Sequence, residues 1–283
     1  MPPGMVSWGY RLVGLSFWIG VGLSAVTCRS GSSEGERRQA SVGSAAVRVA
    51  ADQALTEPQS NATVRADWLE ITTGGGKSDA VLPWVLAVHG LGDRPEAFSR
   101  LFQDFPVAAH VYVLRAPRPY HNGFDWFGVQ VSGPPDALAQ AVRHAADGVA
   151  AIAVVLARDP RNAGLPVVTG FSQGGYVSFA MAALHPELIR AALPVAGSLP
   201  RPLWPTRASD NLPPIIAFHG VADPVVALAP TRELCDALRG QRFNATLTEY
   251  PDVGHQIAPA IFRDWQDALS AQLADTKPKA SGT

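Results

Sequence analysis

The pentapeptide Gly170-Phe171-Ser172-Gln173-Gly174 constrains the fold more than any other stretch of this sequence. The apolar run 165–169 before it predicts a buried strand, and residues 175–184 after it have the spacing of a helix. A G-x-S-x-G pattern between a strand and a helix is typical of a nucleophile elbow, a sharp turn that exposes a serine hydroxyl. The sequence therefore predicts Ser172 as a nucleophile, although a Gly–Ser loop without chemistry also fits the pattern alone.

Short apolar runs alternate with segments of helical spacing through most of the chain. Strands are expected at 68–72, 84–88, 111–114, 165–169, 191–195, 214–218 and 243–250, and helices at 135–156, 175–184, 230–238 and 259–273. Such alternation predicts an α/β fold with a mostly parallel central sheet and helices on both faces. Together with the elbow it indicates an α/β-hydrolase fold, and the short interval between Ser172 and Asp223 leaves no room for a large cap domain.

A serine hydroxyl near neutral pH needs a base, and the base needs an acid that orients it. In the α/β-hydrolase fold these partners follow the serine in the order acid, then histidine. His255 lies between the last expected strand and the last expected helix, and Asp223 follows the strand 214–218. We therefore predict Asp223 and His255 as the partners of Ser172. Asp252 is the competing acid, although its closeness to His255 along the chain also suits a turn or a helix cap.

The loop His89-Gly90-Leu91-Gly92-Asp93 comes directly after the strand 84–88. A tetrahedral intermediate carries an oxyanion that needs two donors, and in this architecture an early loop and the residue after the nucleophile provide them. The backbone N–H groups of Leu91 and Gln173 are therefore the predicted oxyanion donors. On its glycine content alone, the loop could equally be a tight turn without a catalytic role.

The overall charge and the cysteine content exclude several other classes of function. Lys and Arg number 23 against 24 Asp and Glu, so the chain lacks the basic excess that binding to nucleic acid requires. Of the two cysteines, Cys235 lies in a helical pattern with no histidine beside it, and we interpret it as a buried hydrophobe rather than a nucleophile. The sequence does not indicate an oligomeric state.

The first residues have the pattern of an export signal. Arg11 precedes an apolar run from Leu12 to Val26, which is short for a membrane span of about 20 residues. We expect an exported protein that is periplasmic, secreted or anchored to a membrane. Cys28 lies where a bacterial lipoprotein carries its lipid, but Ala25 and Thr27 make an imperfect lipobox. Both membrane attachment through a lipid on Cys28 and ordinary cleavage nearby stay open.

The remaining boundaries follow from composition. We expect a signal peptide over residues 1–28, a flexible linker rich in Ser, Gly, Ala and Arg over 29–65, a catalytic domain over 66–276 and a polar tail over 277–283. No internal repeat is evident in the sequence. The catalytic domain is therefore expected to fold around one core.

Six motifs spread along this domain resemble a known family. They are VHGLGD at 88–93, RAPRPY at 115–120, NGFDWFG at 122–128, GFSQGG at 170–175, HGVADPVV at 219–226 and VGHQI at 253–257. In these motifs the chain resembles the phospholipase/carboxylesterase family of α/β hydrolases, which includes the acyl-protein thioesterases. The resemblance implies a triad of Ser172, Asp223 and His255, oxyanion donors at Leu91 and Gln173, and no cofactor or metal.

Two features depart from the family pattern. Acyl-protein thioesterases act in the cytosol, whereas this chain carries an export signal, which makes intracellular lipidated proteins poor candidates as substrates. Gly128 stands where the family usually has an acid, next to Trp126 and Phe127. These two aromatic residues are predicted as apolar walls of an open substrate cleft, or else as ordinary core residues.

These observations predict a serine carboxylesterase that hydrolyses short- to medium-chain carboxylic esters of small molecules through an acyl-enzyme. A thioesterase, a lysophospholipase or another serine hydrolase would use the same three side chains. A lipoprotein that keeps the fold and only binds a ligand in its cleft is the alternative from a different class.

Overall fold

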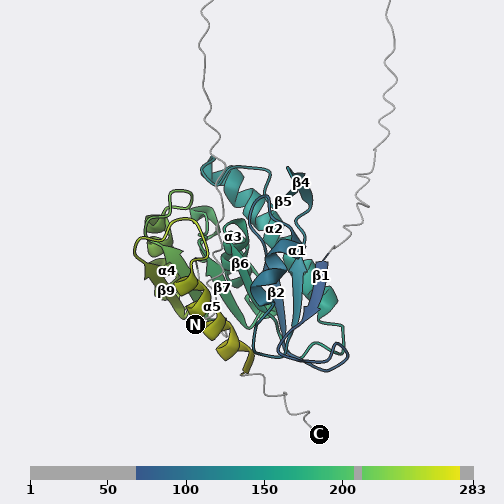
Figure 1. Ribbon diagram of the computed structural model, residues 1–283. Coiled ribbons are helices and arrows are strands. Elements are labelled where there is room, and N and C mark those ends of the chain that lie inside the picture. Colours follow the sequence, from purple (N-terminus) through teal and green to yellow (C-terminus); the bar gives the residue numbers. More distant parts are fainter. Residues whose placement is uncertain (1–67, 207–211, 275–283) are drawn as a thin grey trace, which may run out of the picture. The chain divides into compact units, whose positions relative to one another are not determined.

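A seven-stranded sheet organises the computed structural model, which describes residues 68–206 and 212–274 (Figure 1). The strand order is β1-β3-β2-β6-β7-β8-β9, with β1 antiparallel to β3 and the other pairs parallel. The strands are β1 (Trp68–Thr72), β2 (Trp84–Val88), β3 (His110–Leu114), β6 (Val167–Phe171), β7 (Ala191–Val195), β8 (Ile215–Gly220) and β9 (Ala245–Tyr250). The predicted leader, linker, tail and Cys28 lie outside the described residues and stay predictions.

The side chains of the strands point alternately to the two faces of the sheet, and each face has its own cluster of buried apolar residues. In β2 every residue is buried, with Leu86 in one cluster and Val85 in the other, because successive side chains of a strand point to opposite faces. Helices α2 (Pro135–Leu156), α3 (Gln173–Leu184) and α4 (Leu228–Gly240) contribute to the first cluster. Helices α1 (Pro95–Phe98) and α5 (Pro259–Ala274) contribute to the second. The predicted α/β fold with helices on both faces is confirmed.

Helix α2 begins at Pro135, whose missing N–H costs nothing at the first helical position. Among the described residues, α2 has the length and apolar composition that could also cross a membrane. Its buried residues, Val142 and Ala146 among them, pack in the first apolar cluster beside α3. The helix therefore serves the core of this domain.

Two of the differences from the sequence prediction have a plain physical reason. Strand β6 begins at Val167 instead of Leu165, because Pro166 has no N–H for a ladder and the Leu165 side chain is exposed. A two-stranded hairpin of β4 (Arg118–Tyr120) and β5 (Gly123–Asp125) was not predicted. All three residues of β4 are exposed, so the hairpin has no apolar alternation that would mark it in the sequence.

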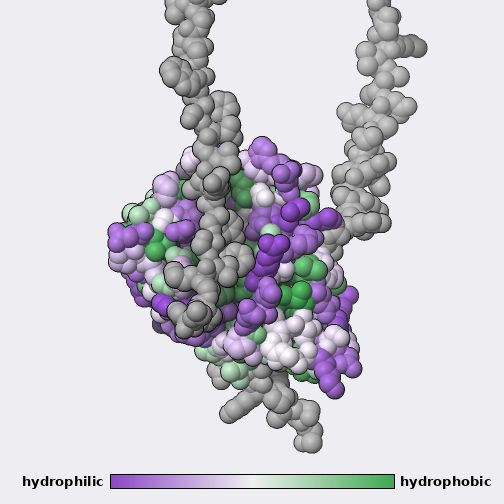
Figure 2. All heavy atoms as spheres, in the orientation of Figure 1, coloured by the Kyte–Doolittle hydropathy of each residue, from purple (hydrophilic) through white to green (hydrophobic). Residues whose placement is uncertain are grey.

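The loops that follow β2, β6, β8 and β9 all leave the sheet at the same edge, because these four strands are parallel. The carboxyl edge of a parallel sheet is where α/β proteins place their ligand sites. Leu91, Ser172, Asp223 and His255 lie in these four loops. On the face that Figure 2 shows, hydrophilic and hydrophobic side chains of the described residues are mixed.

Candidate active site

Ser172 sits in a strained turn between β6 and α3. Its φ of 56° and ψ of −115° lie outside the regions that side-chain-bearing residues normally occupy. The flanking glycines allow the turn, since a Cβ on Gly170 would lie 2.6 Å from the carbonyl oxygen of Val88 and one on Gly174 only 1.9 Å from it. The G-x-S-x-G pattern therefore reflects how closely β6 and α3 approach the end of β2.

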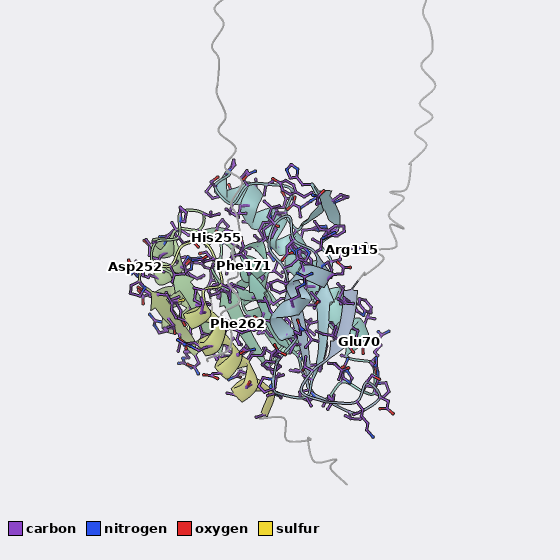
Figure 3. All side chains as sticks on the ribbon, in the orientation of Figure 1. Glu70, Arg115, Phe171, Asp252, His255 and Phe262 are labelled. Carbon is purple, nitrogen blue, oxygen red and sulfur yellow. The ribbon has the colours of Figure 1, made fainter. Side chains whose placement is uncertain are left out.

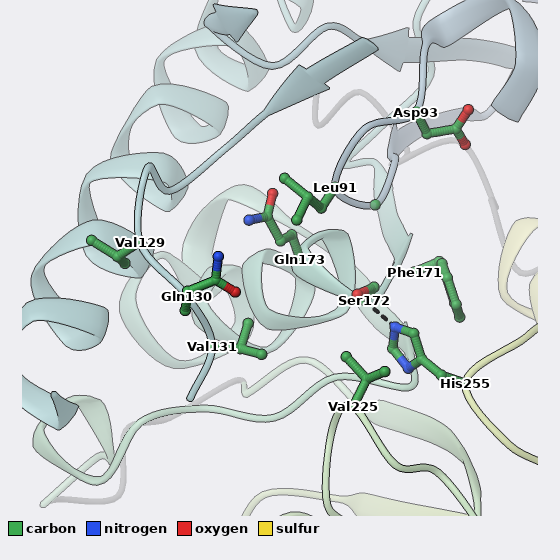
Figure 4. Close-up of a pocket in the computed structure, with 11 residues that line it drawn as sticks. Leu91, Asp93, Val129, Gln130, Val131, Phe171, Ser172, Gln173, Val225 and His255 are labelled. Carbon is green, nitrogen blue, oxygen red and sulfur yellow. Dashed lines mark hydrogen bonds between the residues drawn. The ribbon is translucent and has the colours of Figure 1, made fainter. Parts of the chain in front are cut away.

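Three side chains that are far apart in the sequence form one chain of hydrogen bonds. His255 Nε2 lies 2.8 Å from Ser172 Oγ, the contact drawn in Figure 4. His255 Nδ1 lies 2.7 Å from Asp223 Oδ2, so Asp223 rather than Asp252 is the acid that contacts this imidazole. With the proton on Nδ1 donated to the carboxylate, Nε2 is free to accept the serine hydroxyl proton.

Asp223 is buried but fully hydrogen-bonded. Its side chain is 0% exposed, and Oδ1 accepts the backbone N–H groups of Val225 at 2.8 Å and Val226 at 2.9 Å. These bonds compensate the desolvation of the carboxylate and fix the direction in which Oδ2 faces His255. The acid is therefore held by its own loop.

His219 makes a further hydrogen bond to the loop that carries Asp223. Its Nε2–H donates to the carbonyl of Val226 at 2.9 Å, and its Nδ1 is buried without a hydrogen-bond partner among the described residues. Burial lowers the pKa of His219 below its usual value near 6.5, which keeps the ring neutral. A neutral His219 leaves the carboxylate of Asp223, 3.7 Å away, to His255.

Phe171 lines the imidazole on its other side. The ring centroids of Phe171 and His255 lie 4.8 Å apart with an interplanar angle of 35°, and Figure 3 shows the two residues side by side. The His255 side chain is 16% exposed, so the aromatic ring limits its contact with water without closing the site. Sequence reasoning did not assign this role to Phe171.

The two predicted oxyanion donors lie on the opposite side of Ser172. Gln173 is the first residue of α3, so its N–H has no acceptor within the helix. The N–H of Leu91 makes no backbone hydrogen bond among those of the described residues. Leu91, Gln173 and Ser172 border the same pocket (Figure 4). Both N–H groups are therefore available to a bound oxygen.

The pocket over Ser172 has a volume of about 310 Å³. Leucine, phenylalanine and valine side chains form its apolar wall, and Asp93 and Gln130 are polar members in addition to Ser172, Gln173 and His255. Its lining residues are Gly90, Leu91, Asp93, Val129, Gln130, Val131, Phe171, Ser172, Gln173, Val225 and His255. An apolar pocket with a few convergent polar groups is the usual form of a small-molecule site.

Of the two roles predicted for Trp126 and Phe127, pocket wall or core, the structure shows the second, since both belong to the first apolar cluster and neither lines this pocket. They are only 5% and 3% exposed, because the Trp126 indole donates to the His89 carbonyl and Phe127 packs edge-on against Tyr176. The wall is provided instead by the residues that follow Gly128, namely Val129 and Val131. No sequence signal identified these two valines, since two apolar residues around a glutamine also suit a loop.

The described residues contain no group of three or more His, Cys, Asp or Glu side chains that could hold a metal ion. Cys235 is buried, and its burial raises the pKa of the thiol to about 11, which leaves it protonated at neutral pH. The Ser172 hydroxyl and the His255 imidazole, by contrast, both line the pocket.

Comparison with known proteins finds a matching family model and related sequences. The family model described as Phospholipase/Carboxylesterase matches residues 70–273. A probable carboxylesterase of Oryza sativa subsp. japonica is 33% identical over 124 residues, 40% of this chain and 52% of the rice protein. A probable inactive carboxylesterase of the same plant is 26% identical over 194 residues, 62% of this chain and 78% of its own. The chain thus spans about half the length of the first relative.

Solved structures of several esterases have the same fold. Esterase PE8 matches with a TM-score of 0.62 at 20% identity, covering 74% of this chain and all of its own. The Bacillus cereus carboxylesterase matches with a TM-score of 0.61 at 17% identity, covering 76% of this chain and 97% of its own. Zea mays acyl-protein thioesterase 2 matches with a TM-score of 0.58 at 24% identity, covering 73% and 99%.

Proposed function

Because this chain belongs to the phospholipase/carboxylesterase family of hydrolases, we propose that it is a serine carboxylesterase acting on short- to medium-chain carboxylic esters. The chain of hydrogen bonds from Ser172 through His255 to Asp223 is the observation that carries this proposal. The fold itself is shared by esterases and thioesterases, so the choice of substrate rests on the pocket.

In the proposed reaction Ser172 Oγ attacks the ester carbonyl carbon while His255 Nε2 takes the hydroxyl proton. The carbonyl oxygen becomes an oxyanion, which the N–H groups of Leu91 and Gln173 stabilise. When the intermediate collapses, the bond to the alcohol oxygen breaks and His255 returns its proton to that oxygen. Water then attacks the acyl-serine by the same route and releases the carboxylic acid.

The pocket favours a small, apolar acyl group. A volume of about 310 Å³ is at the low end of the roughly 300–1,000 Å³ typical of ligand pockets. Val129, Val131 and Val225 supply apolar wall, which suits hydrocarbon better than a charged chain. A series of p-nitrophenyl esters of increasing acyl length should therefore show the highest kcat/KM at short to medium chains, with long chains poorly used.

A non-catalytic binding protein is the second candidate, because one rice relative is named a probable inactive carboxylesterase. The hydrogen bonds of Ser172 and His255 favour the enzyme over this alternative. Covalent labelling by a fluorophosphonate probe separates the two, since only an activated serine reacts. Thioesters and lysophospholipids, tested beside the esters, separate the related hydrolase activities.

Replacement of the nucleophile tests the proposal directly. Ser172→Ala should lower kcat on p-nitrophenyl butyrate by on the order of 10⁶, as loss of a catalytic serine does in other serine hydrolases. The same variant should lose fluorophosphonate labelling. Ser178→Ala is the matched control, because Ser178 lies in α3, the helix that directly follows Ser172, and its hydroxyl bonds the carbonyl of Gly174. Near-normal turnover by Ser172→Ala would overturn the assignment of the nucleophile.

A further inference from the structure

We propose that Asp125 and Trp126 are positioning residues that hold both oxyanion donors in place beside Ser172. The inference rests on the proposed function, and it assigns a role to the segment 125–128, which begins at the last residue of β5 and lies outside the pocket wall. We call Asp125 and Trp126 the oxyanion brace. One arm of this brace reaches the donor at Gln173, and the other reaches the loop that carries Leu91.

The first arm fastens Gln173 at both ends of its side-chain amide. Gln173 Oε1 accepts the backbone N–H of Trp126 at 3.0 Å, and Gln173 Nε2 donates to Asp125 Oδ1 at 2.9 Å. The side chain is buried at 2% exposure, so these bonds have no competition from water. Because the side-chain amide of Gln173 is held at both its oxygen and its nitrogen, the Gln173 backbone has less freedom to rotate. The backbone N–H of Gln173 is the predicted oxyanion donor.

Asp125 is itself rigidly held, which makes it a suitable anchor. Its Oδ1 also accepts the N–H of Phe127 at 2.9 Å, and its Oδ2 accepts the N–H of Gly128 at 2.7 Å. Arg118 Nε lies 3.5 Å from Oδ2 and offsets the charge of the carboxylate. Asp125 is 8% exposed, and hydrogen bonds to a buried carboxylate are among the stronger ones in proteins.

The second arm reaches the other donor through an indole. Trp126 Nε1–H donates to the carbonyl of His89 at 3.0 Å, and His89 precedes Gly90 and Leu91 at the end of β2. The His89 ring braces the next carbonyl, since its Nδ1–H donates to Gly90 at 2.7 Å while its Nε2 accepts the N–H of Ala116 at 3.3 Å. The first two carbonyls of this loop are thus both fixed by buried donors.

The segment 125–128 connects the two elements that carry the oxyanion donors. The two donors come from different elements, the loop after β2 and the start of α3, and the segment 125–128 contacts both. It contacts neither His255 nor Asp223 in the hydrogen bonds of the described residues. Since oxyanion donors act only when preorganised, loosening this brace should slow the chemical step and leave proton transfer unaffected.

Removal of each arm by a near-isosteric change tests the proposal. Trp126→Phe deletes the indole donor and Asp125→Asn weakens the anchor of Gln173. Each should lower kcat on p-nitrophenyl butyrate by roughly 10- to 100-fold with KM unchanged, because a misplacement of about 1 Å can cost 10²-fold. The pH dependence of kcat should stay that of the wild type. Affinity for a boronic acid, which mimics the tetrahedral intermediate, should fall in parallel with kcat.

Trp84→Phe is the matched control, because the indole of the buried Trp84 also donates to a backbone carbonyl, that of Gly164, at 2.9 Å. Trp84 lies at the opposite end of β2 from the loop of Leu91. This variant should lose stability but retain kcat. If Trp126→Phe and Asp125→Asn behave as Trp84→Phe does, the brace has a structural role only and the proposal is overturned.

Hydrogen exchange completes the test. Hydrogen exchange in the brace variants should speed up in peptides covering 89–92 and 172–176, and stay unchanged in 223–226 and 253–257. If exchange in the peptides 89–92 and 172–176 is unchanged in the brace variants, the brace proposal is overturned. If the wild type fails to label with fluorophosphonate, the proposed function is refuted instead.

Discussion

The two sides of Ser172 are built from different kinds of groups. On one side, which we call the imidazole side, the His255 side chain faces the serine hydroxyl at 2.8 Å, and the Asp223 side chain faces His255 at 2.7 Å. On the other, the oxyanion side, backbone N–H groups of Leu91 and Gln173 face the pocket, and side chains such as that of Trp126 only support them. Side-chain identity therefore decides function directly on the first side and indirectly on the second.

The comparison predicts that equivalent substitutions have unequal effects. Asp223→Asn should lower kcat by about 10⁴-fold, as the loss of the orienting carboxylate does in other serine hydrolases, because an amide N–H facing His255 Nδ1 selects the wrong tautomer. The same change at Asp125, on the oxyanion side, should cost much less. Steady-state kinetics of the two purified variants, with circular dichroism to verify folding, measures the difference. Equal losses in both would show that the two sides are not distinct.

The same difference explains what the sequence could predict about this site. Ser172, Asp223 and His255 are of chemically specific residue types in a recognisable order, so their mutual contacts could be expected before any coordinates. A backbone donor carries no such mark, because every residue except proline has an N–H. Leu91 and Gln173 could be named only from the architecture of the fold.

The two roles left open for Trp126 and Phe127 have a related cause. Aromatic residues suit both a substrate wall and a core, and residue type does not say which way a segment faces. That direction depends on the hairpin of β4 and β5, whose exposed strand β4 gives no apolar pattern. Strands β2, β3 and β7 were predictable for the opposite reason, since buried parallel strands form continuous apolar runs.

Adding a methyl group to the elbow, in Gly174→Ala, tests the oxyanion side through its effect on the free energy of unfolding. The Cβ of Gly174→Ala would lie 1.9 Å from the carbonyl oxygen of Val88, so α3 and the end of β2 must separate. We expect the free energy of unfolding to fall by about 3 kcal/mol, the upper part of the usual range for overpacking. Because the strain falls between the two oxyanion donors, kcat should also fall while the pH dependence is retained.

Gly148→Ala in α2 is the control for this variant, since a Cβ there meets nothing within 4 Å. It should raise stability by roughly 0.5–1 kcal/mol through helix propensity and leave kcat unchanged. Chemical denaturation of both variants gives the two free energies. If Gly174→Ala is as stable as the wild type, the close approach of the elbow to β2 does not limit the fold.

Each side of Ser172 has one buried histidine that donates a hydrogen bond to a loop carbonyl. The smallest predicted effect is the change of stability with pH as these two histidines become protonated. His219 donates to Val226 on the imidazole side, and His89 donates to Gly90 on the oxyanion side. Burial lowers the pKa of both rings in the folded state, whereas the unfolded chain has a pKa near 6.5. Between these two values the unfolded state binds more protons, so stability is full above about pH 6.5 and is lost as the pH falls through the lowered pKa.

Denaturation curves measured from neutral to mildly acidic pH should therefore show the free energy of unfolding decreasing below about pH 6.5. His219→Phe and His89→Phe should each make this decrease shallower, because each removes one group that takes up a proton on unfolding. Each should also cost about 1–3 kcal/mol at neutral pH, since the carbonyl of Val226 or Gly90 loses its donor. A pH dependence that persists unchanged in both variants would mean that carboxyl groups, and not these two histidines, control the acid response. If only one of the two variants has a shallower pH dependence, the histidine replaced in that variant alone makes stability sensitive to acid.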